Sequence, residues 1–311
     1  MLAQLRADFP ENLRIVFRHF PLPVHDKSLL AAQAAEAAGL QGKFWDMKTA
    51  LFEQQAEWSA LTNQDFESWL NQTAIVIGVD PIKFSADLKS QEIADKVLAA
   101  REEAIRLGIP YTPFLVINGK MWQGPRDYNS LKDVTNLLLL EKRQFTGCPP
   151  FTVDITKQYI ASIETEKGTI VIQLYPDKAP LAVNNFVFLA NNGYFDGITF
   201  HRVVKGYLAQ SGDPSGTGYG GPGYAFINEI DPTLKFDKAG LVGMANVGPD
   251  TNGSQFFITL TSMPKLDGKY TIFGQVIQGL SVVQALSERD PSQGIPLTPG
   301  DKILHVTVEE K

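Results

Sequence analysis

The periodicity of the sequence changes near residues 144–157, and this change most constrains what the chain can fold into. Before it, an apolar helical run covers 134–140, whereas after it residues 159–164 alternate as a β-strand does. The segment between them contains glycine and a Pro-Pro pair, which end regular elements and keep a linker stiff. With 311 residues, the chain is long enough to form two cores. We predict a first domain at 1–145, a linker at 146–157 and a second domain at 158–311.

Short strand-like runs dominate the second half of the sequence. Residues 165–168 separate two of them as a hairpin turn, and a last strand is expected at 302–309. Helical periodicity occurs at 179–192 and again near 280–287. Short strands between glycine-rich loops suit a sheet that closes on itself, because closure removes exposed edges. The second half therefore predicts a closed antiparallel β-barrel with two helices.

The first half has a mixed pattern in which helices predominate. A strand is expected at 12–20, helices over most of 27–55 and 63–107, and a turn, a short buried strand and a tight reversal at 109–120. Residues that favour helix ends fall at the joints. Expected starts are Asn63 and Asp80-Pro81, and expected ends are Gly78 and Gly108. This order of elements predicts an α/β domain.

Three motifs of the second half carry the strongest indication of function. They are Phe200-His201-Arg202 with Gln210 eight residues later, Met244-Ala245-Asn246, and Asn252-Gly253-Ser254-Gln255-Phe256-Phe257. With Leu266-Asp267-Gly268-Lys269, they make the segment 159–311 resemble a cyclophilin over nearly its whole length. The resemblance implies a cyclophilin barrel and peptidyl-prolyl cis–trans isomerase activity on proline-containing peptides and unfolded client proteins, without a cofactor.

The same resemblance assigns roles to individual positions of this chain. The residues expected to be catalytic are Arg202, Gln210 and Phe257. The residues expected to bind the substrate are Tyr207, Leu208, Ala245, Asn246, Gln255, Leu266 and Tyr270.

These residue types suit the chemistry of the implied reaction. Conjugation holds an X–Pro amide planar with a barrier of about 18 to 20 kcal/mol, and a catalyst must bind the twisted amide more tightly than the planar one. The twisted proline nitrogen regains a lone pair, which a preorganised cation can engage in a partly dry groove. Arg202 is the candidate for that cation. Because the reaction transfers no proton, we interpret His201 as structural.

Each candidate also has a plainer interpretation. An isolated arginine is more often a surface ion-pair partner, and Phe257 and Leu266 could be ordinary core residues. The amides of Gln210 and Asn246 could simply satisfy buried backbone groups. The surrounding motifs favour the active-site interpretation.

Four positions depart from the usual cyclophilin pattern. Tyr207 and Leu208 replace Phe and Met, and these changes preserve bulk. Lys265 stands where a Trp or Phe is usual at the pocket rim, and Tyr270 stands where a His is usual. We therefore predict poor binding of the inhibitor cyclosporin. A non-catalytic proline-peptide binder remains an alternative, because these two changes could also remove turnover.

The first half resembles a thioredoxin-fold disulfide oxidoreductase of the DsbA type with a helical insertion. The similarity rests on residues 16–22, on the helix from Ala32 to Trp45, and on Thr112-Pro113 before 114–119. It implies that Pro113 is the family's cis-proline, although only about 5 to 6% of X–Pro bonds in folded proteins are cis. By the same comparison, the first strand and the Cys-x-x-Cys motif would lie before residue 1. We expect a truncated start or a domain without a redox role.

The cysteine and histidine content limits the chemistry of the chain. Its one cysteine, Cys148, cannot run dithiol exchange, which needs two thiols in sequence. The four histidines and this cysteine show no metal-ligand spacing, so no metal site is expected. A remnant of a bifunctional oxidoreductase and isomerase is accordingly the weaker alternative.

The overall charge excludes some classes of partner. A net charge of −6 and a pI near 5.3 give no basic footprint for nucleic acid.

The sequence contains no run of about 18 apolar residues and no signal peptide at its start, so no membrane span is expected. Disulfide pairing and proline isomerisation are both slow folding steps outside the cytoplasm, so the two domains together would suit an extracytoplasmic folding factor. We expect a bacterial origin, and for a full-length form a location in the periplasm or at the cell surface. The leading hypothesis is a peptidyl-prolyl isomerase whose first domain binds unfolded clients.

Overall fold

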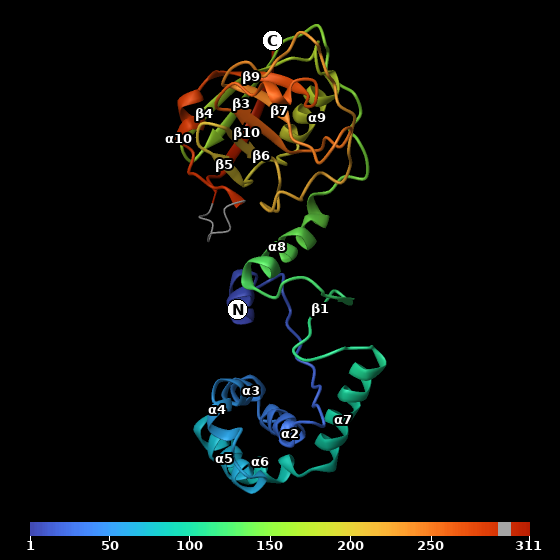
Figure 1. Ribbon diagram of the computed structural model, residues 1–311, viewed down its shortest axis with the longest axis vertical. Coiled ribbons are helices and arrows are strands. Elements are labelled where there is room, and N and C mark those ends of the chain that lie inside the picture. Colours follow the sequence, from blue (N-terminus) through green and yellow to red (C-terminus); the bar gives the residue numbers. More distant parts are fainter. Residues whose placement is uncertain (292–299) are drawn as a thin grey trace. The chain divides into compact units, whose positions relative to one another are not determined.

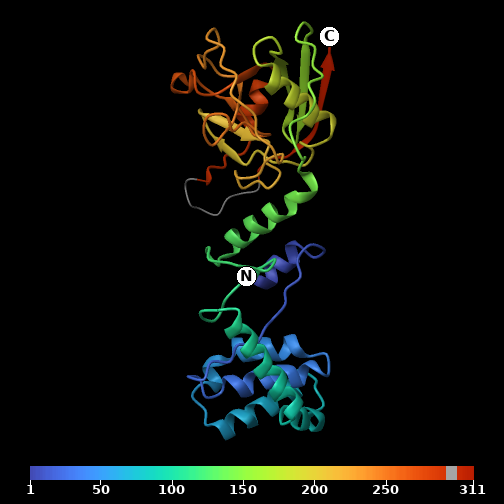
Figure 2. The same ribbon diagram turned by 90° about the vertical axis from the view of Figure 1, so that its right-hand side faces the viewer.

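The computed structural model describes residues 1–291 and 300–311 (Figures 1 and 2). The chain divides into two compact units, one formed by Met1–Leu13 and Pro125–Lys311 and the other by Arg14–Gly124. The finer division into 1–145, 146–157 and 158–311 stays a prediction.

An eight-stranded antiparallel sheet forms the body of the first unit (Figure 1). Its strand order is β10-β3-β4-β9-β7-β8-β6-β5. The strands are β3 (Tyr159–Thr165), β4 (Gly168–Leu174), β5 (Arg202–Val204), β6 (Leu208–Ser211), β7 (Leu241–Met244), β8 (Phe256–Thr259), β9 (Ile272–Gln278) and β10 (Ile303–Glu310). The sheet curls, and an isolated bridge between Thr199 and Lys302 joins the approaches to its two edge strands. The predicted antiparallel barrel is confirmed in this form.

The alternating pattern of the sequence explains which face of the sheet is covered. Along β3, buried residues alternate with more exposed ones, and β3 pairs with β4 through the expected turn, where Thr165 faces Gly168. Helix α9 (Pro180–Asn191) is apolar over most of its length, with eight buried residues, and it contributes Phe186 and Leu189 to the main core. Helix α10 (Leu280–Ala285) contributes Val283. Both helices were predicted from the sequence.

Residues 145–153 are bonded to the same body. The backbone N–H of Phe145 donates to the carbonyl of Pro222 at 2.8 Å. The side-chain oxygen of Asn184, on α9, accepts from the backbone N–H groups of Thr152 and Val153 at 2.8 and 3.3 Å, and Val153 belongs to the main core. The segment predicted to be a stiff linker is therefore held to the barrel.

The first unit also contains three helical elements that precede the barrel in the chain. They are α1 (Leu2–Asp8), α8 (Tyr128–Leu138) and the 3-10 helix η1 (Leu139–Arg143). The carboxylate of Asp8, at the end of α1, accepts from the ammonium of Lys132 on α8 at 3.2 Å and from the hydroxyl of Tyr128. A second 3-10 helix, η2 (Pro264–Leu266), lies in the loop before β9.

The second unit is mainly helical, as expected. Its helices are α2 (Ser28–Gly39), α3 (Phe44–Glu53), α4 (Gln55–Trp58), α5 (Asn63–Val76), α6 (Pro81–Leu88) and α7 (Gln91–Arg106). They enclose a core that includes Met47, Phe66, Leu70 and Phe84. Across residues 1–291 and 300–311, no helix is both long and apolar enough to cross a membrane.

One of the expected helix starts is displaced by a residue. Helix α6 begins as predicted, since the carboxylate of Asp80 accepts from the backbone N–H groups of Ile82 and Lys83. Helix α5 is instead capped by Thr62, whose hydroxyl oxygen accepts from the backbone N–H of Asp65 at 3.1 Å. The prediction of Asn63 was wrong because Thr62 is the residue with the extended backbone that a cap requires, and Asn63 is already helical.

Two expected strands of this unit differ from the structure. Residues 14–20 alternate in exposure but form no strand, because no neighbouring strand pairs with them among the described residues. The short strand after Gly108 is present as β1 (Val116–Ile117), paired with β2 (Lys120–Met121). It was predicted to be buried, yet Val116 is 50% exposed, since this two-stranded hairpin belongs to no larger sheet.

Candidate active site

The ladder of β5, β6 and β8 aligns the three residues expected to be catalytic. Arg202 on β5 is the register partner of Gln210 on β6, and Gln210 is in turn the partner of Phe257 on β8. The spacing of eight residues between Arg202 and Gln210 follows from the hairpin, whose turn contains Gly206 with φ of 68°. A positive φ is readily adopted by glycine, which allows the tight reversal. Residues that are distant in sequence therefore form one row across the sheet.

Arg202 is the exposed end of this row, and Tyr207 lies beside it in the turn between β5 and β6. Both side chains are at least partly open to solvent, with Tyr207 40% exposed. The guanidinium carbon of Arg202 lies 5.9 Å from the centre of the Tyr207 ring, which is within the range of a cation–π contact. The substitution of Tyr for the usual Phe keeps this aromatic surface. Arg202 is thus a half-buried cation supported by an aromatic face.

Two glutamines form the polar centre of the candidate site. The amide nitrogen Nε2 of Gln210 donates to Oε1 of Gln255 at 2.9 Å. Nε2 of Gln255 then donates to the carbonyl oxygens of Gly218 and Gly220, at 3.0 and 2.9 Å. Gln255 therefore connects the row to the glycine-rich loop, and its orientation is fixed by three hydrogen bonds. The role of those two glycine carbonyls was not foreseen, because no local pattern marks a backbone acceptor.

The glycine-rich loop is organised by Asp213. Its carboxylate accepts from the backbone N–H groups of Ser215 and Gly218, at 2.7 and 2.6 Å, and from the hydroxyl of Ser215. A Cβ added to Gly220 would lie only 2.0 Å from Oδ1 of Asp213. Glycine is therefore required at that position by close packing. The loop turns tightly around a buried carboxylate.

Asparagine side chains from the loops on either side of β7 and before β8 join one another beside the polar centre. Nδ2 of Asn246 is 3.1 Å from Oδ1 of Asn252 and 3.3 Å from Oδ1 of Asn228. The backbone N–H of Ala245 donates to the carbonyl of Gln255 at 2.9 Å, which places Ala245 beside the polar centre. Asn228 was missed at the sequence level, since it lies outside every motif.

An apolar cluster flanks the polar row. Phe257 stacks on Phe236 with 5.5 Å between ring centres, and Phe257 and Tyr270 are nearly perpendicular with 5.9 Å between ring centres. Leu208 and Phe257 are 5% and 3% exposed, so both have the burial of core residues. Leu266, Tyr270 and Ala245 pack against this cluster while remaining partly exposed. The apolar surface open to a ligand therefore comes mainly from these three residues, over a floor made by Phe257 and Leu208.

His201 directly precedes Arg202 in the chain and is 2% exposed. Burial lowers the pKa of its imidazole to about 4, and the neighbouring charges of Arg289 and Arg202 act in the same direction, whereas Asp213 opposes them. Within the described part of the chain, neither ring nitrogen has a hydrogen-bond partner. A neutral, buried imidazole fits the structural role expected for His201.

The two remaining predicted features lie outside this row. The Thr112–Pro113 peptide bond is cis, and it belongs to the mainly helical unit. Cys148 is exposed in the segment before β3, where its thiol is 3.5 Å from the carbonyl oxygen of Ala225. In residues 1–291 and 300–311, no cluster of three histidine, cysteine or acidic side chains could hold a metal ion.

Comparison with known proteins identifies the family of the second half of the chain. The family model described as cyclophilin-type peptidyl-prolyl cis-trans isomerase matches residues 160–308. The human protein named peptidyl-prolyl cis-trans isomerase-like 1 is 52% identical over 124 residues, which cover 39% of this chain and 75% of that protein. The protein of the same name from Rhizopus delemar is 51% identical over 127 residues, covering 40% and 77%. This chain belongs to the cyclophilin family of peptidyl-prolyl isomerases.

Further matches concern the first half of the chain and a solved structure. A thioredoxin family model matches residues 3–136, so the expected thioredoxin-like domain is confirmed. A cyclophilin-type isomerase from Cryptosporidium parvum covers 50% of this chain and 99% of its own, with 35% identity and a TM-score of 0.45. The human and Rhizopus delemar relatives are eukaryotic, and they give no support to the expected bacterial origin.

Proposed function

We propose that Arg202 catalyses prolyl isomerisation by engaging the nitrogen of the twisted X–Pro amide. Rotation abolishes conjugation and leaves a lone pair on that nitrogen, and a donor that meets it only in the twisted state lowers the barrier. The observation that carries the proposal is the row Arg202, Gln210 and Phe257, which joins a cation, a fixed amide and an apolar floor. A partly buried cation in the site stabilises the transition state more than the same cation would in water, because it is already oriented when the amide twists.

The remaining site residues divide into two groups by chemistry. Ala245, Leu266 and Tyr270, over Phe257 and Leu208, would hold the proline ring by apolar contact. Gln210, Asn246 and Gln255 would hold the polar peptide groups on either side of the rotating bond, since their amides can both donate and accept. Tyr207 would support the guanidinium of Arg202. Proline-containing segments of unfolded proteins are the substrate class that fits both groups.

The thioredoxin-like domain would act as a binding module for unfolded clients. It contributes exposed apolar side chains, among them Val76 at 83%, Ile82 at 82% and Phe52 at 61% exposure. Dithiol chemistry is not assigned to this chain, because the printed sequence contains a single cysteine. Similarity of the first half to disulfide oxidoreductases of the DsbA type stays a prediction.

The exchange rate of an Ala-Pro-Phe-type peptide, measured by NMR for the intact chain, tests the proposal. Replacing Arg202 by alanine should reduce the catalysed rate by about 100- to 1,000-fold, the usual cost of removing one preorganised donor. Arg202→Lys should recover only part of the loss, since an ammonium lacks the planar fork of a guanidinium. Peptide affinity should change far less than the rate.

Two other outcomes would redirect the proposal. Full activity in Arg202→Ala would remove Arg202 from the mechanism. Peptide binding without acceleration, in both the intact chain and the variant, would make this a proline-peptide adaptor that has lost turnover.

A further inference from the structure

Strand β5, which carries Arg202, is the shortest of the described strands of this sheet and lies at its edge. It has three residues, and it is the last strand in the sheet order, bonded on one side to β6. On its other side, one isolated bridge joins it to the chain that follows α10. In this bridge Val203 and Arg289 exchange both backbone hydrogen bonds, at 2.7 and 2.9 Å. An edge strand this short depends on side-chain contacts to keep its position.

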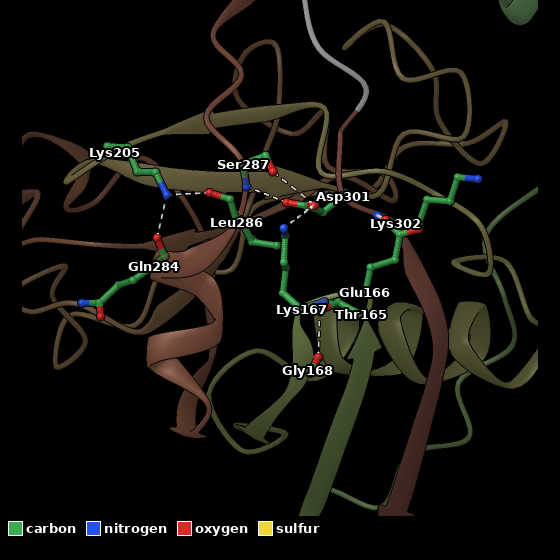
Figure 3. Close-up of polar contacts among 10 residues, drawn as sticks. All are labelled: Thr165, Glu166, Lys167, Gly168, Lys205, Gln284, Leu286, Ser287, Asp301 and Lys302. Atoms are coloured by element: carbon green, nitrogen blue, oxygen red, sulfur yellow. Dashed lines mark hydrogen bonds and ion pairs between the residues drawn. The ribbon is translucent and has the colours of Figure 1, made fainter.

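Lys205 supplies such a contact directly after β5. Its ammonium donates to the carbonyl oxygens of Gln284 and Leu286, at 2.7 and 2.6 Å (Figure 3). These carbonyls lie at the carboxyl-terminal end of α10, where helical carbonyls have no helical partner and the helix dipole favours a cation. Lys205 therefore fixes the β5–β6 turn to the end of a helix.

The helix end is itself held to the body of the domain. The carboxylate of Asp301 accepts from the backbone N–H of Ser287 at 2.5 Å and from its hydroxyl at 3.3 Å (Figure 3). The ammonium of Lys167, in the β3–β4 turn, lies 3.6 Å from the same carboxylate. The backbone carbonyl of Asp301 also accepts from the N–H of Phe200, two residues before Arg202. Asp301 is 9% exposed, so this anchor is largely shielded from water.

Burial fixes the helix end further. Leu286 and Val283 are both 0% exposed and belong to the main core. The guanidinium of Arg289 donates to the backbone carbonyl of His201, the residue next to Arg202. The segment from Gln284 to Arg289 therefore contacts the chain both before Arg202, at His201, and after it, at Lys205.

We infer that Lys205 is a positioning residue of the isomerase, which holds the guanidinium of Arg202 at the depth where it meets the twisted amide. This inference rests on the proposed catalytic role of Arg202. Lys205 would not touch the substrate, because its ammonium is directed to the helix carbonyls. Removing the contact would let the β5–β6 turn shift, and a misplacement of a catalytic group by about 1 Å can cost up to about 100-fold in rate.

The test compares Lys205→Met with Lys302→Met in the full chain. Methionine keeps an unbranched, apolar stem and removes the donor. Lys302 is the control because it lies next to Asp301 and its exposed ammonium takes part in none of the contacts drawn in Figure 3. In Lys205→Met, kcat should fall roughly tenfold with KM nearly unchanged, as expected for a loss confined to the transition state. Lys302→Met should keep full activity, and Lys205→Arg should restore most of the rate.

A double-mutant cycle separates positioning from general damage. In an Arg202→Ala background, adding Lys205→Met should leave the residual rate unchanged, because the group that Lys205 positions is gone. An equal fold-loss in both backgrounds would overturn the inference, as would full activity of Lys205→Met beside a collapsed Arg202→Ala. If Arg202→Ala itself stays active, the proposed function fails instead. Thermal unfolding of each variant shows whether the fold persists.

Discussion

Gln210 and Gln255 are joined side chain to side chain, with Nε2 of Gln210 2.9 Å from Oε1 of Gln255. This bond ties the row that contains Arg202 to the glycine-rich loop, because Gln255 also donates to two carbonyls of that loop. Gln210 bonds to a side chain and Gln255 to both a side chain and the backbone. The hydrogen bond of the Gln210 amide therefore differs from the plainer interpretation, in which this amide satisfies a buried backbone group.

Gln255→Met should destabilise the domain and lower its activity. The change removes two donated hydrogen bonds and leaves the carbonyls of Gly218 and Gly220 without that partner, at a cost of about 1 to 3 kcal/mol in the free energy of unfolding. Urea denaturation measures this loss, and NMR exchange measures kcat/KM. Gln278→Met, at an exposed position of β9, is the matched control and should change neither quantity. Equal stability of the two variants would show that the loop does not depend on Gln255.

The strength of the sequence prediction differed between the two halves for a physical reason. In the barrel, β3 and β4 alternate between buried and more exposed residues, and the turn at 165–168 and α9 could be located from local patterns. Residues 14–20 show the same alternation, but a strand also needs a neighbour that supplies hydrogen bonds, and sequence periodicity cannot reveal whether one exists. Residues 14–20 therefore alternate in exposure without forming the strand that was predicted at 12–20.

The residues of the candidate site could be predicted where they belong to a recognisable sequence motif. Arg202, Gln210 and Phe257 were brought together by the ladder, because register fixes which residues face each other. The contributions of Phe236, Asn228 and the loop carbonyls were not predictable, since they depend on tertiary packing between segments distant in sequence.

His201 should make the stability of the barrel depend on pH. Burial lowers its pKa to about 4 in the folded state, whereas an unfolded histidine has a pKa of about 6.5. Between these values the unfolded chain binds the additional proton, so the free energy of unfolding falls as the pH decreases from about 6.5 to about 4. The linked change is on the order of 3 kcal/mol.

Urea denaturation at a series of pH values checks this linkage. His201→Gln removes the titrating group, and its stability should decline less steeply than that of the parent between about pH 6.5 and 4. Identical slopes in the two proteins would show that the imidazole titrates normally in the folded state. His305, which is exposed beside Asp196, provides a control substitution on the same domain.

Lys265 should weaken the binding of cyclosporin. It is exposed on η2, next to Leu266 at the edge of the apolar cluster, and a flexible ammonium offers neither the flat surface nor the indole donor of a tryptophan. Titration calorimetry should give a dissociation constant weaker than micromolar. Lys265→Trp should tighten binding by about tenfold or more, since an aromatic anchor with a hydrogen bond is worth more than 1.4 kcal/mol at a pocket rim. Submicromolar binding by the unchanged chain would contradict the prediction.

Thr62 and Asn63 provide a direct test of the helix start in the thioredoxin-like domain. The hydroxyl of Thr62 accepts from the backbone N–H of Asp65 and also donates to its carboxylate at 2.7 Å. Thr62→Ala should therefore lower the free energy of unfolding by about 1 kcal/mol, the usual cost of losing a cap. Asn63→Ala should cost nothing, because alanine is the better helix former at a position already inside α5. Thermal denaturation of the two variants measures both effects. A larger loss of stability in Asn63→Ala than in Thr62→Ala would show that Asn63 is the cap.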